Sequence, residues 1–250
     1  TYQAASELPK TLESVLHQRY RHVEHIIIDG ASTDGTKDIV ERYIQANDDN
    51  EDCIHRVVFV SEPDKGLYDA MNKGLEKATG NYVVFLNAGD TFPSTDTLEH
   101  IAGCVGEGEA HPGVLYGDTD IVDDTGRFLR RRRLSPPRKL TWRSFRNGML
   151  VCHQAFYVRA DIAKSIPYDT HYKYSADVDW CIKVMKKAAQ QHMTLRNVNA
   201  VIANYLDGGL SVKNHKASLK ERFHVMQSHY GLLTTLIFHF WFLIRSVIQK

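Results

Sequence analysis

Hydrophobic and polar positions in the first third of the chain alternate between a helical and a strand rhythm. Residues 7–20 carry apolar side chains at helical spacing, namely Leu8, Leu12, Val15 and Leu16. Residues 23–28 read as a strand ending in three consecutive isoleucines, which is typical of strands covered on both faces. Helices near 36–44 and 68–78 and strands at 56–60 and 82–86 continue the alternation. This order predicts an α/β fold with a doubly wound, mostly parallel sheet and helices on both faces.

The second half is less regular. Short strands are predicted at 113–116 and 197–205, and a further strand at 150–158 with His153 inside it. A helix is predicted over 177–189, and 127–134 reads as a basic strand or hairpin arm. No repeat and no linker interrupts the pattern. We therefore expect one domain over 1–231, with a nucleotide half (about 1–118) and an acceptor half (about 119–231).

The last residues, 232–250, form a separate apolar segment that predicts a C-terminal helix. It is nearly all apolar from Leu232 to Ile248, with interruptions at His239 and Arg245, and it is shorter than the about 20 apolar residues that a spanning helix needs. Its aromatic residues and flanking basic residues suit a helix lying in a membrane interface. Packing against the domain or a second subunit fits the pattern equally well, so peripheral membrane contact and a homodimer are both open.

Composition limits the class of protein. The chain has 250 residues, 43% of them hydrophobic, and a net charge of +1, so nothing favours a nucleic-acid partner. The four cysteines are far apart and form no CxxC pair, which indicates reduced packing residues rather than a zinc site. No signal-peptide pattern opens the chain. We expect a cytoplasmic protein, held at the inner face of the plasma membrane if its C-terminal helix docks there.

Acidic residues follow three of the predicted strands. Asp29, the segment 62–64 and the segment 87–90 all lie where ligands bind in doubly wound sheets, beyond the carboxyl ends of the strands. Transfer of a sugar from a nucleotide diphosphate needs groups that hold the nucleoside, a cation for the diphosphate and a base for the acceptor hydroxyl. Carboxylates at strand ends can fill these roles.

Several segments, in order, resemble family-two glycosyltransferases of the GT-A fold, the inverting enzymes of bacterial polysaccharide synthesis. They are TYQ at 1–3, IDGASTDGT at 28–36, PDKGLYDAMNKG at 63–74, FLNAGD at 85–90, HQAF at 153–156, YSADVD at 174–179 and GGLS at 208–211. The resemblance covers residues 1 to about 215. Each motif alone is weak, but their order is specific.

The resemblance implies a role for each matching position. The nucleotide sugar would be bound by Thr1, Asp29, Ser32, Asp64, Lys65, Asn72 and Asn87, with Asp29 on the base and Asn87 on the ribose. Asp90 would bind a divalent metal, Mn²⁺ or Mg²⁺. Asp177 would be the general base, while His153 and Asp179 would lie on the acceptor side, Asp179 being a second candidate for the base. The expected partners are a nucleotide-diphosphate sugar, with UDP favoured, and a saccharide or lipid-linked acceptor.

The sequence departs from the family pattern at three places. Residues 87–90 (NAGD) hold one carboxylate where the common motif holds two or three, so the metal should bind more weakly or depend more on the diphosphate. Ala176 stands where a glutamate is usual. The sequence also starts at the final residues of the family's first strand, so we expect either that the parent protein is longer or that the base pocket lacks part of this strand.

Other readings of the same residues remain open. Asp29, Ser32 and Asp177 could serve only as helix caps, Asp90 as a turn residue, His153 as a core histidine, and Arg130 to Arg133 as a solvated face rather than an anion patch. The whole chain could be a non-catalytic sugar-nucleotide-binding subunit. A sugar nucleotidyltransferase would need a glycine-rich, lysine-bearing phosphate loop, which the sequence lacks. A dinucleotide oxidoreductase is disfavoured because no GxGxxG follows a strand.

Overall fold

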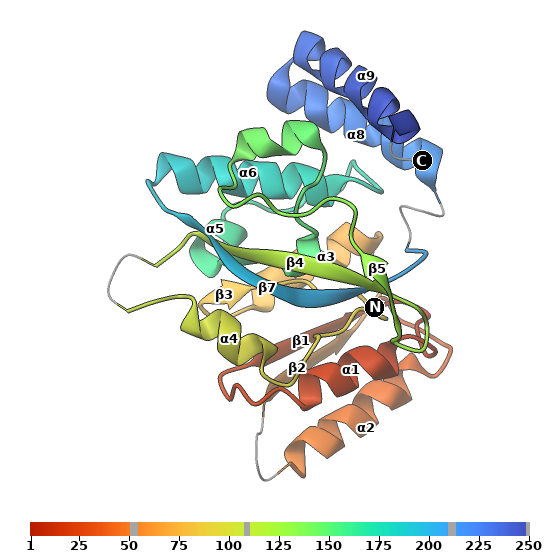
Figure 1. Cartoon of the computed structure of the whole chain (residues 1–250). Coiled ribbons are helices and arrows are strands. Elements are labelled where there is room, and N and C mark those ends of the chain that lie inside the picture. The colour runs from red at the N-terminus through yellow and green to blue at the C-terminus, as the bar shows by residue number, and fades with distance from the viewer. Residues whose placement is uncertain (51–54, 108–110, 210–213, 249–250) are drawn as a thin grey trace.

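The computed structural model describes residues 1–50, 55–107, 111–209 and 214–248 (Figure 1). Its helices are α1 (Leu8–Leu16), α2 (Thr36–Asp48), α3 (Leu67–Lys77), α4 (Thr97–Gly103), α5 (Ala160–Lys164), α6 (Ala176–Gln190), α8 (His215–Tyr230) and α9 (Leu232–Ile248). Two 3₁₀ turns are η1 (Trp142–Asn147) and η2 (His153–Ala155). Its strands are β1 (Glu24–Asp29), β2 (Arg56–Ser61), β3 (Tyr82–Val83), β4 (Val114–Val122), β5 (Phe128–Arg131), β6 (Phe156–Arg159) and β7 (Leu195–Leu206).

The smaller sheet pairs β1 with β2 in parallel, with Asp29 opposite Ser61 at its end. Helix α3 packs against β1, and Ile27 of β1 belongs to a buried cluster with Leu12 of α1 and Val40 of α2. The apolar run of β1 is therefore covered by helices. Thr1 lies beside the end of β1, where its amine donates to the carbonyl of Ile28 and its carbonyl accepts from the N–H of Gly30 at 2.9 Å. This pairing matches the position that the resemblance gives to residues 1–3.

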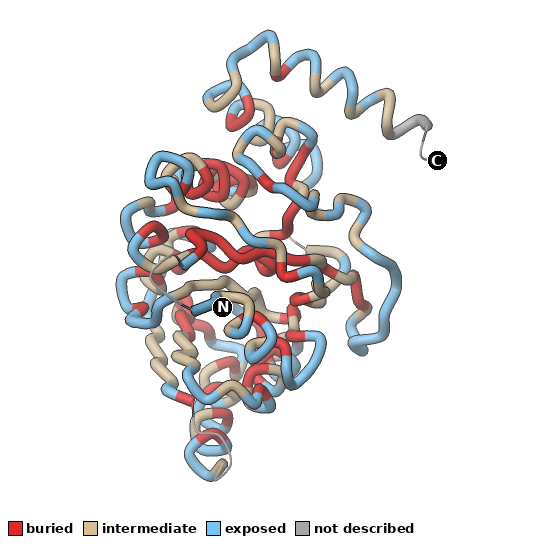
Figure 2. The backbone as a smooth tube through the Cα atoms, turned by 60° about the vertical axis from the view of Figure 1, so that its left-hand side comes forward, coloured by how far each residue is buried: buried red, intermediate tan, exposed pale blue. Residues whose placement is uncertain are grey.

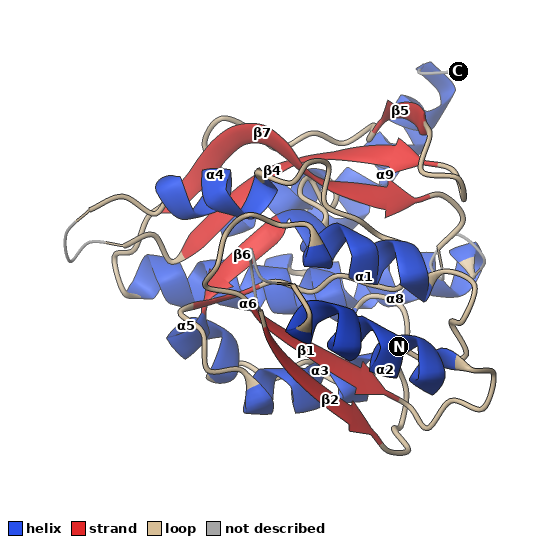
Figure 3. Cartoon of the chain, turned by 90° about the horizontal axis from the view of Figure 1, so that it is seen from below, coloured by secondary structure: helices blue, strands red, loops and turns tan. Residues whose placement is uncertain are grey.

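The larger sheet is centred on β4. Strand β7 pairs with β4 in parallel, β5 and β6 pair with it antiparallel, and β3 pairs antiparallel with β6. Figure 3 shows the β1–β2 pair apart from these strands. The predicted α/β layering with helices on both sides is confirmed, and the larger sheet is mixed, combining parallel and antiparallel pairs.

The main core lies between β4 and α6. Tyr116 on β4, Phe156 on β6 and Trp180 on α6 are each at most 1% exposed. Figure 2 shows buried backbone running through the centre of the molecule, while α9 stands out at one end. Helices α6, α8 and α9 are stacked on one side of the larger sheet and α1 and α2 lie on the opposite side of the molecule (Figure 1). No helix in the described part of the chain is both long and apolar enough to cross a membrane.

Several sequence predictions change in detail. The strand predicted at 150–158 is wrong in its first half: His153 lies in η2, and the strand begins only at Phe156. The turn forms because the N–H of Ala155 bonds to the carbonyl of Cys152 at 2.9 Å, which breaks the extended pattern. The basic segment 127–134 does form a hairpin arm, β5, and the helix predicted from residue 232 is present as α9.

Candidate active site

Asp29, the last residue of β1, is fully buried and holds three hydrogen bonds. It accepts from the Ser32 backbone N–H at 2.9 Å, from the Ser32 hydroxyl at 2.5 Å and from the Ser61 hydroxyl at 2.6 Å. Burial raises the pKa of Asp29, but the bonds from Ser32 and Ser61 outweigh burial and leave that pKa below its ordinary value. The strand end therefore presents a fixed, ionised carboxylate.

Thr1, Gly30 and Asp64 meet beside Asp29. A Cβ atom at Gly30 would lie 2.5 Å from Oδ2 of Asp64, so only glycine permits this approach. Asp64 accepts the N–H of Gly66 at 2.8 Å through its other oxygen. The hydroxyl of Thr1 is buried without a hydrogen-bond partner, so it can still bond a bound molecule. The structure thus brings together Thr1, Asp29, Ser32 and Asp64.

Asp90 lies in the loop after β3 and is 3% exposed. One carboxylate oxygen accepts the N–H of Leu206 on β7 at 3.0 Å, and the other accepts the amide of Gln154 at 2.6 Å. Burial raises the pKa of Asp90 above its ordinary value despite these bonds and the nearby His153. These contacts fix the carboxylate at the edge where β7 and η2 converge.

A divalent cation fits Asp90 only with help from a ligand. Each carboxylate oxygen uses one lone pair on its protein donor and keeps another for a hard cation such as Mn²⁺ or Mg²⁺. Within residues 1–50, 55–107, 111–209 and 214–248, no group of three or more His, Cys, Asp or Glu side chains is placed to hold a metal. The diphosphate of a donor would have to supply the remaining oxygens.

Asn87, His153 and Asp177 form a continuous polar chain. The amide of Asn87 lies 3.2 Å from Nε2 of His153, and Nδ1 of His153 lies 3.4 Å from Oδ2 of Asp177. The loop after β3, the turn η2 and the first turn of α6 each contribute one member. Residues predicted separately for the ribose, the acceptor and the base are therefore neighbours.

Asp177 lies at the N-terminus of α6 with its side chain 17% exposed. Its Oδ1 accepts the N–H of Val178 at 2.9 Å and the hydroxyl of Tyr68 at 3.3 Å. Burial raises the pKa of Asp177, but His153, by hydrogen bond and charge, and Arg222, by charge, leave it below its ordinary value. A carboxylate that stays ionised and has histidine and tyrosine neighbours can accept a proton.

Arg222, on α8, is a cation that sequence reasoning missed. Its Nε is buried and has no hydrogen-bond partner, although Asp177 is near enough for its charge to act on the guanidinium. Burial lowers the pKa of Arg222, and the charge of Arg132 lowers it further while that of Asp177 raises it. A buried guanidinium N–H without a partner is costly unless a ligand uses it.

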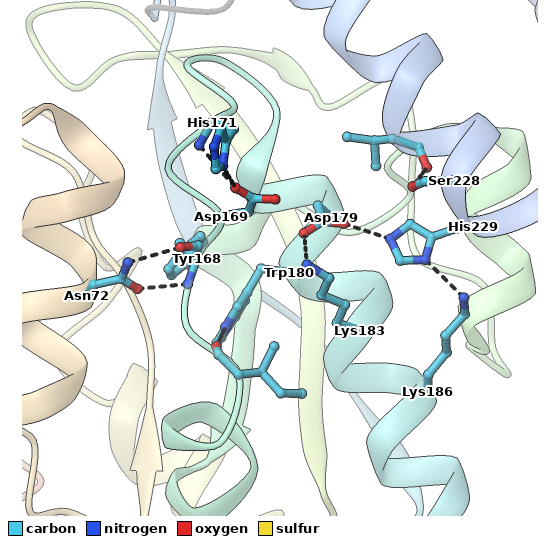
Figure 4. Close-up of polar contacts among 12 residues, drawn as sticks. Asn72, Tyr168, Asp169, His171, Asp179, Trp180, Lys183, Lys186, Ser228 and His229 are labelled. Carbon is cyan, nitrogen blue, oxygen red and sulfur yellow. Dashed lines mark hydrogen bonds and ion pairs between the residues drawn. The ribbon is translucent and has the colours of Figure 1, made fainter.

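Asp179 follows Asp177 by two positions but faces α8. Figure 4 shows its carboxylate between Lys183 and His229, with O–N distances of 2.7 Å to each. The far nitrogen of His229 lies 2.9 Å from the amine of Lys186. Burial raises the pKa of Asp179, but its bonds to His229 and Lys183 outweigh burial and leave that pKa lowered. Its two oxygens are thus engaged within the protein, away from the chain of Asn87, His153 and Asp177.

Asn72 and Lys65 also lie outside the group of residues at the end of β1 and outside the polar chain that ends at Asp177. The amide of Asn72 on α3 bonds the backbone of Tyr168 twice, at 3.0 Å and 2.7 Å (Figure 4). The side chain of Lys65 is in an exposed loop, and only its backbone N–H bonds Asp69, at 2.9 Å. Their predicted contacts with a nucleotide sugar stay predictions, as do the roles predicted for the other site residues. The last residues of the GGLS motif, 210 and 211, lie outside the described residues.

Four site neighbours had little signal in the sequence. Ser61 could have been found from strand register, because it faces Asp29 across β1 and β2. Gln154 follows His153 within the HQAF motif. Tyr68, within the motif at 63–74, and Arg222, outside every quoted motif, reach Asp177 from helices far away in sequence.

Comparison with known proteins places this arrangement in a family. The family model for glycosyl transferase family 2 matches residues 1–166, which hold the β1 and β3 ends and η2. The chain belongs to glycosyltransferase family 2. A glycosyltransferase of PGL/p-HBAD biosynthesis from Mycobacterium tuberculosis (strain H37Ra) is 33% identical over 213 residues, covering 84% of this chain and 76% of the relative.

Solved structures give the same fold. Staphylococcus aureus TarS 1–349 in complex with UDP-GlcNAc superposes with a TM-score of 0.68 at 19% identity, over 91% of this chain and 62% of TarS 1–349. The mannosyltransferase PcManGT from Pyrobaculum calidifontis, in complex with GDP-Man and Mn²⁺, has a TM-score of 0.60 at 18% identity, over 91% of this chain and 60% of that one. The predicted GT-A fold is therefore confirmed, and this chain spans less than two thirds of both solved chains.

Proposed function

We propose that this family 2 glycosyltransferase moves one sugar from a nucleotide-diphosphate donor to an acceptor hydroxyl with inversion. The observation that carries the proposal is the chain from Asn87 through His153 to Asp177, which holds an ionised carboxylate beside the strand ends. A helix cap alone would not need a histidine and a tyrosine on the same carboxylate. The division into a nucleotide half and an acceptor half is part of this proposal.

The nucleoside would bind at the end of β1. Asp29 is ionised and oriented by two serines, and the free hydroxyl of Thr1 and the carboxylate of Asp64 lie beside it. Fixed acceptors of this kind suit the N–H group of a base and the hydroxyls of a ribose. UDP is the favoured carrier, because TarS, a structural neighbour, is known in complex with UDP-GlcNAc.

The diphosphate would leave between Asp90 and Arg222. A guanidinium with a buried, unpaired N–H can bond a phosphate oxygen, and this contact would strengthen as the leaving group gains charge. Asp90 would hold Mn²⁺ or Mg²⁺ together with the diphosphate, and the cation would supply positive charge to the leaving group. PcManGT, with GDP-Man and Mn²⁺ bound, supports a divalent metal in this fold.

Asp177 would act as the general base. As the acceptor oxygen bonds to the anomeric carbon, the bond from that carbon to the diphosphate oxygen breaks and the hydroxyl proton passes to the carboxylate of Asp177. One displacement inverts the anomeric centre. His153 would orient Asp177 through the 3.4 Å contact and keep it ionised, rather than touch the proton itself.

The acceptor is proposed to be a saccharide or a lipid-linked glycan of a surface polysaccharide, made on the cytoplasmic side of the membrane. Support comes from the relative named for PGL/p-HBAD biosynthesis and from the resemblance to polysaccharide enzymes. Peripheral membrane contact would bring such an acceptor to the site, and a homodimer is the alternative use of the apolar C-terminal helix.

The test combines binding with turnover. Thermal shift with UDP, GDP and their sugars, with and without Mn²⁺, should show a metal-enhanced shift for one nucleotide, about 2.7 kcal/mol at a hundred times Kd. Incubation of that donor with lipid-linked acceptors should release the nucleoside diphosphate, and Asp177→Asn should bind the donor without transferring it. The exposed Asp38→Asn is the matched control.

Other outcomes would name other functions. A donor that binds while neither wild type nor Asp177→Asn turns it over with any acceptor indicates a binding subunit. Pyrophosphate release from a nucleoside triphosphate and a sugar phosphate indicates a nucleotidyltransferase.

A further inference from the structure

Helix α9 is amphipathic, but its apolar side faces outward, the opposite of what is usual for a helix on a surface in contact with water. Every side chain of residues 232–243 that is at least 40% exposed is apolar; they are Leu232, Leu233, Leu236, Ile237, Phe240, Trp241 and Leu243. At 100° per residue these positions fall on one side of the helix. We call these seven residues the outward face of α9.

The side chains of Thr235, His239 and Arg245 in α9 contact the protein instead. Thr235 is fully buried and bonds the carbonyl of Gly231 at 2.8 Å. The ring of His239 packs edge-on against Phe223 of α8, and Arg245 bonds the carbonyl of Asn147 in η1 at 3.2 Å. The helix is therefore anchored through these side chains, and Figure 2 shows it at the end of the molecule, with exposed and intermediate residues alternating along most of its length.

Arginines border the outward face on the side of η1. The guanidinium of Arg146 lies 5.5 Å from the ring centre of Phe238, that of Arg245 lies 5.2 Å from Phe242, and that of Arg143 lies 4.4 Å from Trp142. None of these three arginines is in an ion pair with a carboxylate among the described residues. Stacking on aromatic rings leaves the positive charge available to an outside partner.

The chain segments that build this end lack acidic residues. Residues 138–148, which include η1, hold three arginines and one lysine but no Asp or Glu, and no Asp or Glu occurs from residue 222 to 250. The net charge of the whole chain is only +1, so this charge is concentrated locally. An apolar face bordered by arginines without carboxylates has the pattern of a surface that meets anionic headgroups and acyl chains together.

We propose that the outward face of α9 docks peripherally on a membrane surface that contains anionic phospholipid. Leu233, Ile237 and Phe240 enter the boundary between headgroups and acyl chains, and Arg143 and Arg146 contact the phosphates. A second copy of the chain is the less favourable occupant, because a two-fold interface through α9 would bring two arginine borders together with no carboxylates to balance them.

Helix α8 connects the docked helix α9 to the candidate active site. The carboxylate of Glu221 on α8 accepts the backbone N–H groups of Lys173, Tyr174 and Ser175, at 2.9, 2.7 and 3.1 Å, just before Asp177. His229, near the end of α8, bonds Asp179 on α6 at 2.7 Å. A membrane bound by α9 would thus be held in a fixed relation to α6, with the proposed base at its N-terminus.

The first test measures binding of the full chain to vesicles by flotation. Vesicles of phosphatidylcholine with phosphatidylglycerol should bind the protein and shift its tryptophan emission to the blue, whereas vesicles of phosphatidylcholine alone should bind it far less. Leu233→Ser, Ile237→Ser and Phe240→Ser together should lower partitioning on the order of a thousandfold, since each buried side chain of this size contributes about tenfold. Unchanged flotation of this triple variant would overturn the proposal.

The triple variant has a matched control. Phe128→Ser with Leu129→Ser removes apolar side chains of similar exposure, 54% and 47%, from β5. That variant should float as the wild type does. Equal loss of binding in both variants would mean general stickiness and would also overturn the proposal. The UDP-induced thermal shift, measured on each variant, reports the fold and the donor site independently of lipid.

Charge is tested separately. Arg143→Gln with Arg146→Gln should weaken binding to the anionic vesicles by about fivefold for each arginine and reduce its salt dependence. Arg143→Lys with Arg146→Lys keeps the charge and should restore most of the binding, and Arg21→Gln with Arg42→Gln is the control elsewhere on the surface. Sedimentation velocity tests whether a second copy of the chain covers α9 instead. A wild-type dimer that the triple variant converts to a monomer, with no flotation of either protein, would overturn the proposal.

Discussion

Two carboxylates on the same helix, Asp177 and Asp179, show how two regions of this molecule differ. Two residues along an α-helix turn a side chain by about 200°, so the two carboxylates face nearly opposite ways. Asp177 looks toward the strand ends and is 17% exposed, while Asp179 looks toward α8 and is 4% exposed. The two carboxylates are chemically the same, but one lies in a region open to a ligand and the other is enclosed between helices.

The environments of the two carboxylates differ in completeness. Asp179 is ion-paired with Lys183 and hydrogen-bonded to His229, at 2.7 Å each, so its charge has a partner within the protein. Around Asp177 the contacts are longer, 3.3 and 3.4 Å, and the Nε of nearby Arg222 is buried and unpaired. A buried donor without a partner is typical of a region that binds a ligand transiently. The predictions below test this contrast, from the largest effect to the smallest.

The strongest test of the open region is Asp177→Asn. We expect transfer to fall about 10³-fold, within the range for losing a general base, because the amide cannot accept the hydroxyl proton. UDP binding and the thermal midpoint should change little. Steady-state kinetics with donor and acceptor, beside a thermal shift, measure both. Retained transfer would move the base to another residue.

Arg222 should have the next largest effect. Arg222→Met should lower kcat/KM about 100-fold, the usual loss for one donor that stabilises developing charge. Arg222→Lys keeps the charge but not the planar fork, so its activity should lie between. Arg42→Met on α2 is the control. Normal UDP affinity and kcat in Arg222→Met would show that the guanidinium merely balances Asp177.

The closed region should respond in stability rather than chemistry. Asp179→Asn removes a buried charge facing Lys183 and His229, which should cost about 3 kcal/mol and lower the thermal midpoint by about 5–10 °C. Asp169→Asn is the matched control, since Asp169 pairs with His171 at a similar 2.8 Å but the histidine side chain is 94% exposed. That exposed pair should contribute under about 1 kcal/mol. Equal losses in both variants would contradict the contrast in burial.

Acid should remove the difference between wild type and Asp179→Asn. The pKa of Asp179 is lowered in the folded protein, so its stabilisation is complete above the unfolded pKa of about 3.9 and is lost as the pH falls through the folded value. The thermal midpoints of the two proteins should therefore approach each other as the pH falls below about 5, and meet only below the folded pKa of Asp179. Thermal midpoints taken across this range test the sign; a constant gap would mean that Asp179 is not ionised in the folded state.

Local patterns predicted the end of β1 and the turn after it. Asp29 and Ser32 are three residues apart after a buried strand, so their contact follows from one turn and needs no distant partner. The alternation of strands and helices likewise predicted β1, β2, α2 and α3, because each buries one periodic face. His153 was misplaced because an apolar run cannot reveal a 3₁₀ turn within it.

The sequence by itself determined the elements, the acidic strand ends and the presence of an apolar C-terminal helix. Only the tertiary structure decided that Asp179 is enclosed, that Asn72 holds Tyr168, and that Arg222 reaches Asp177 from α8. It also decided that α9 contacts the protein through Thr235, His239 and Arg245 and turns its apolar face outward. The reason is physical: periodicity fixes which residues share a face of a helix, but only packing against the rest of the chain decides which way that face points.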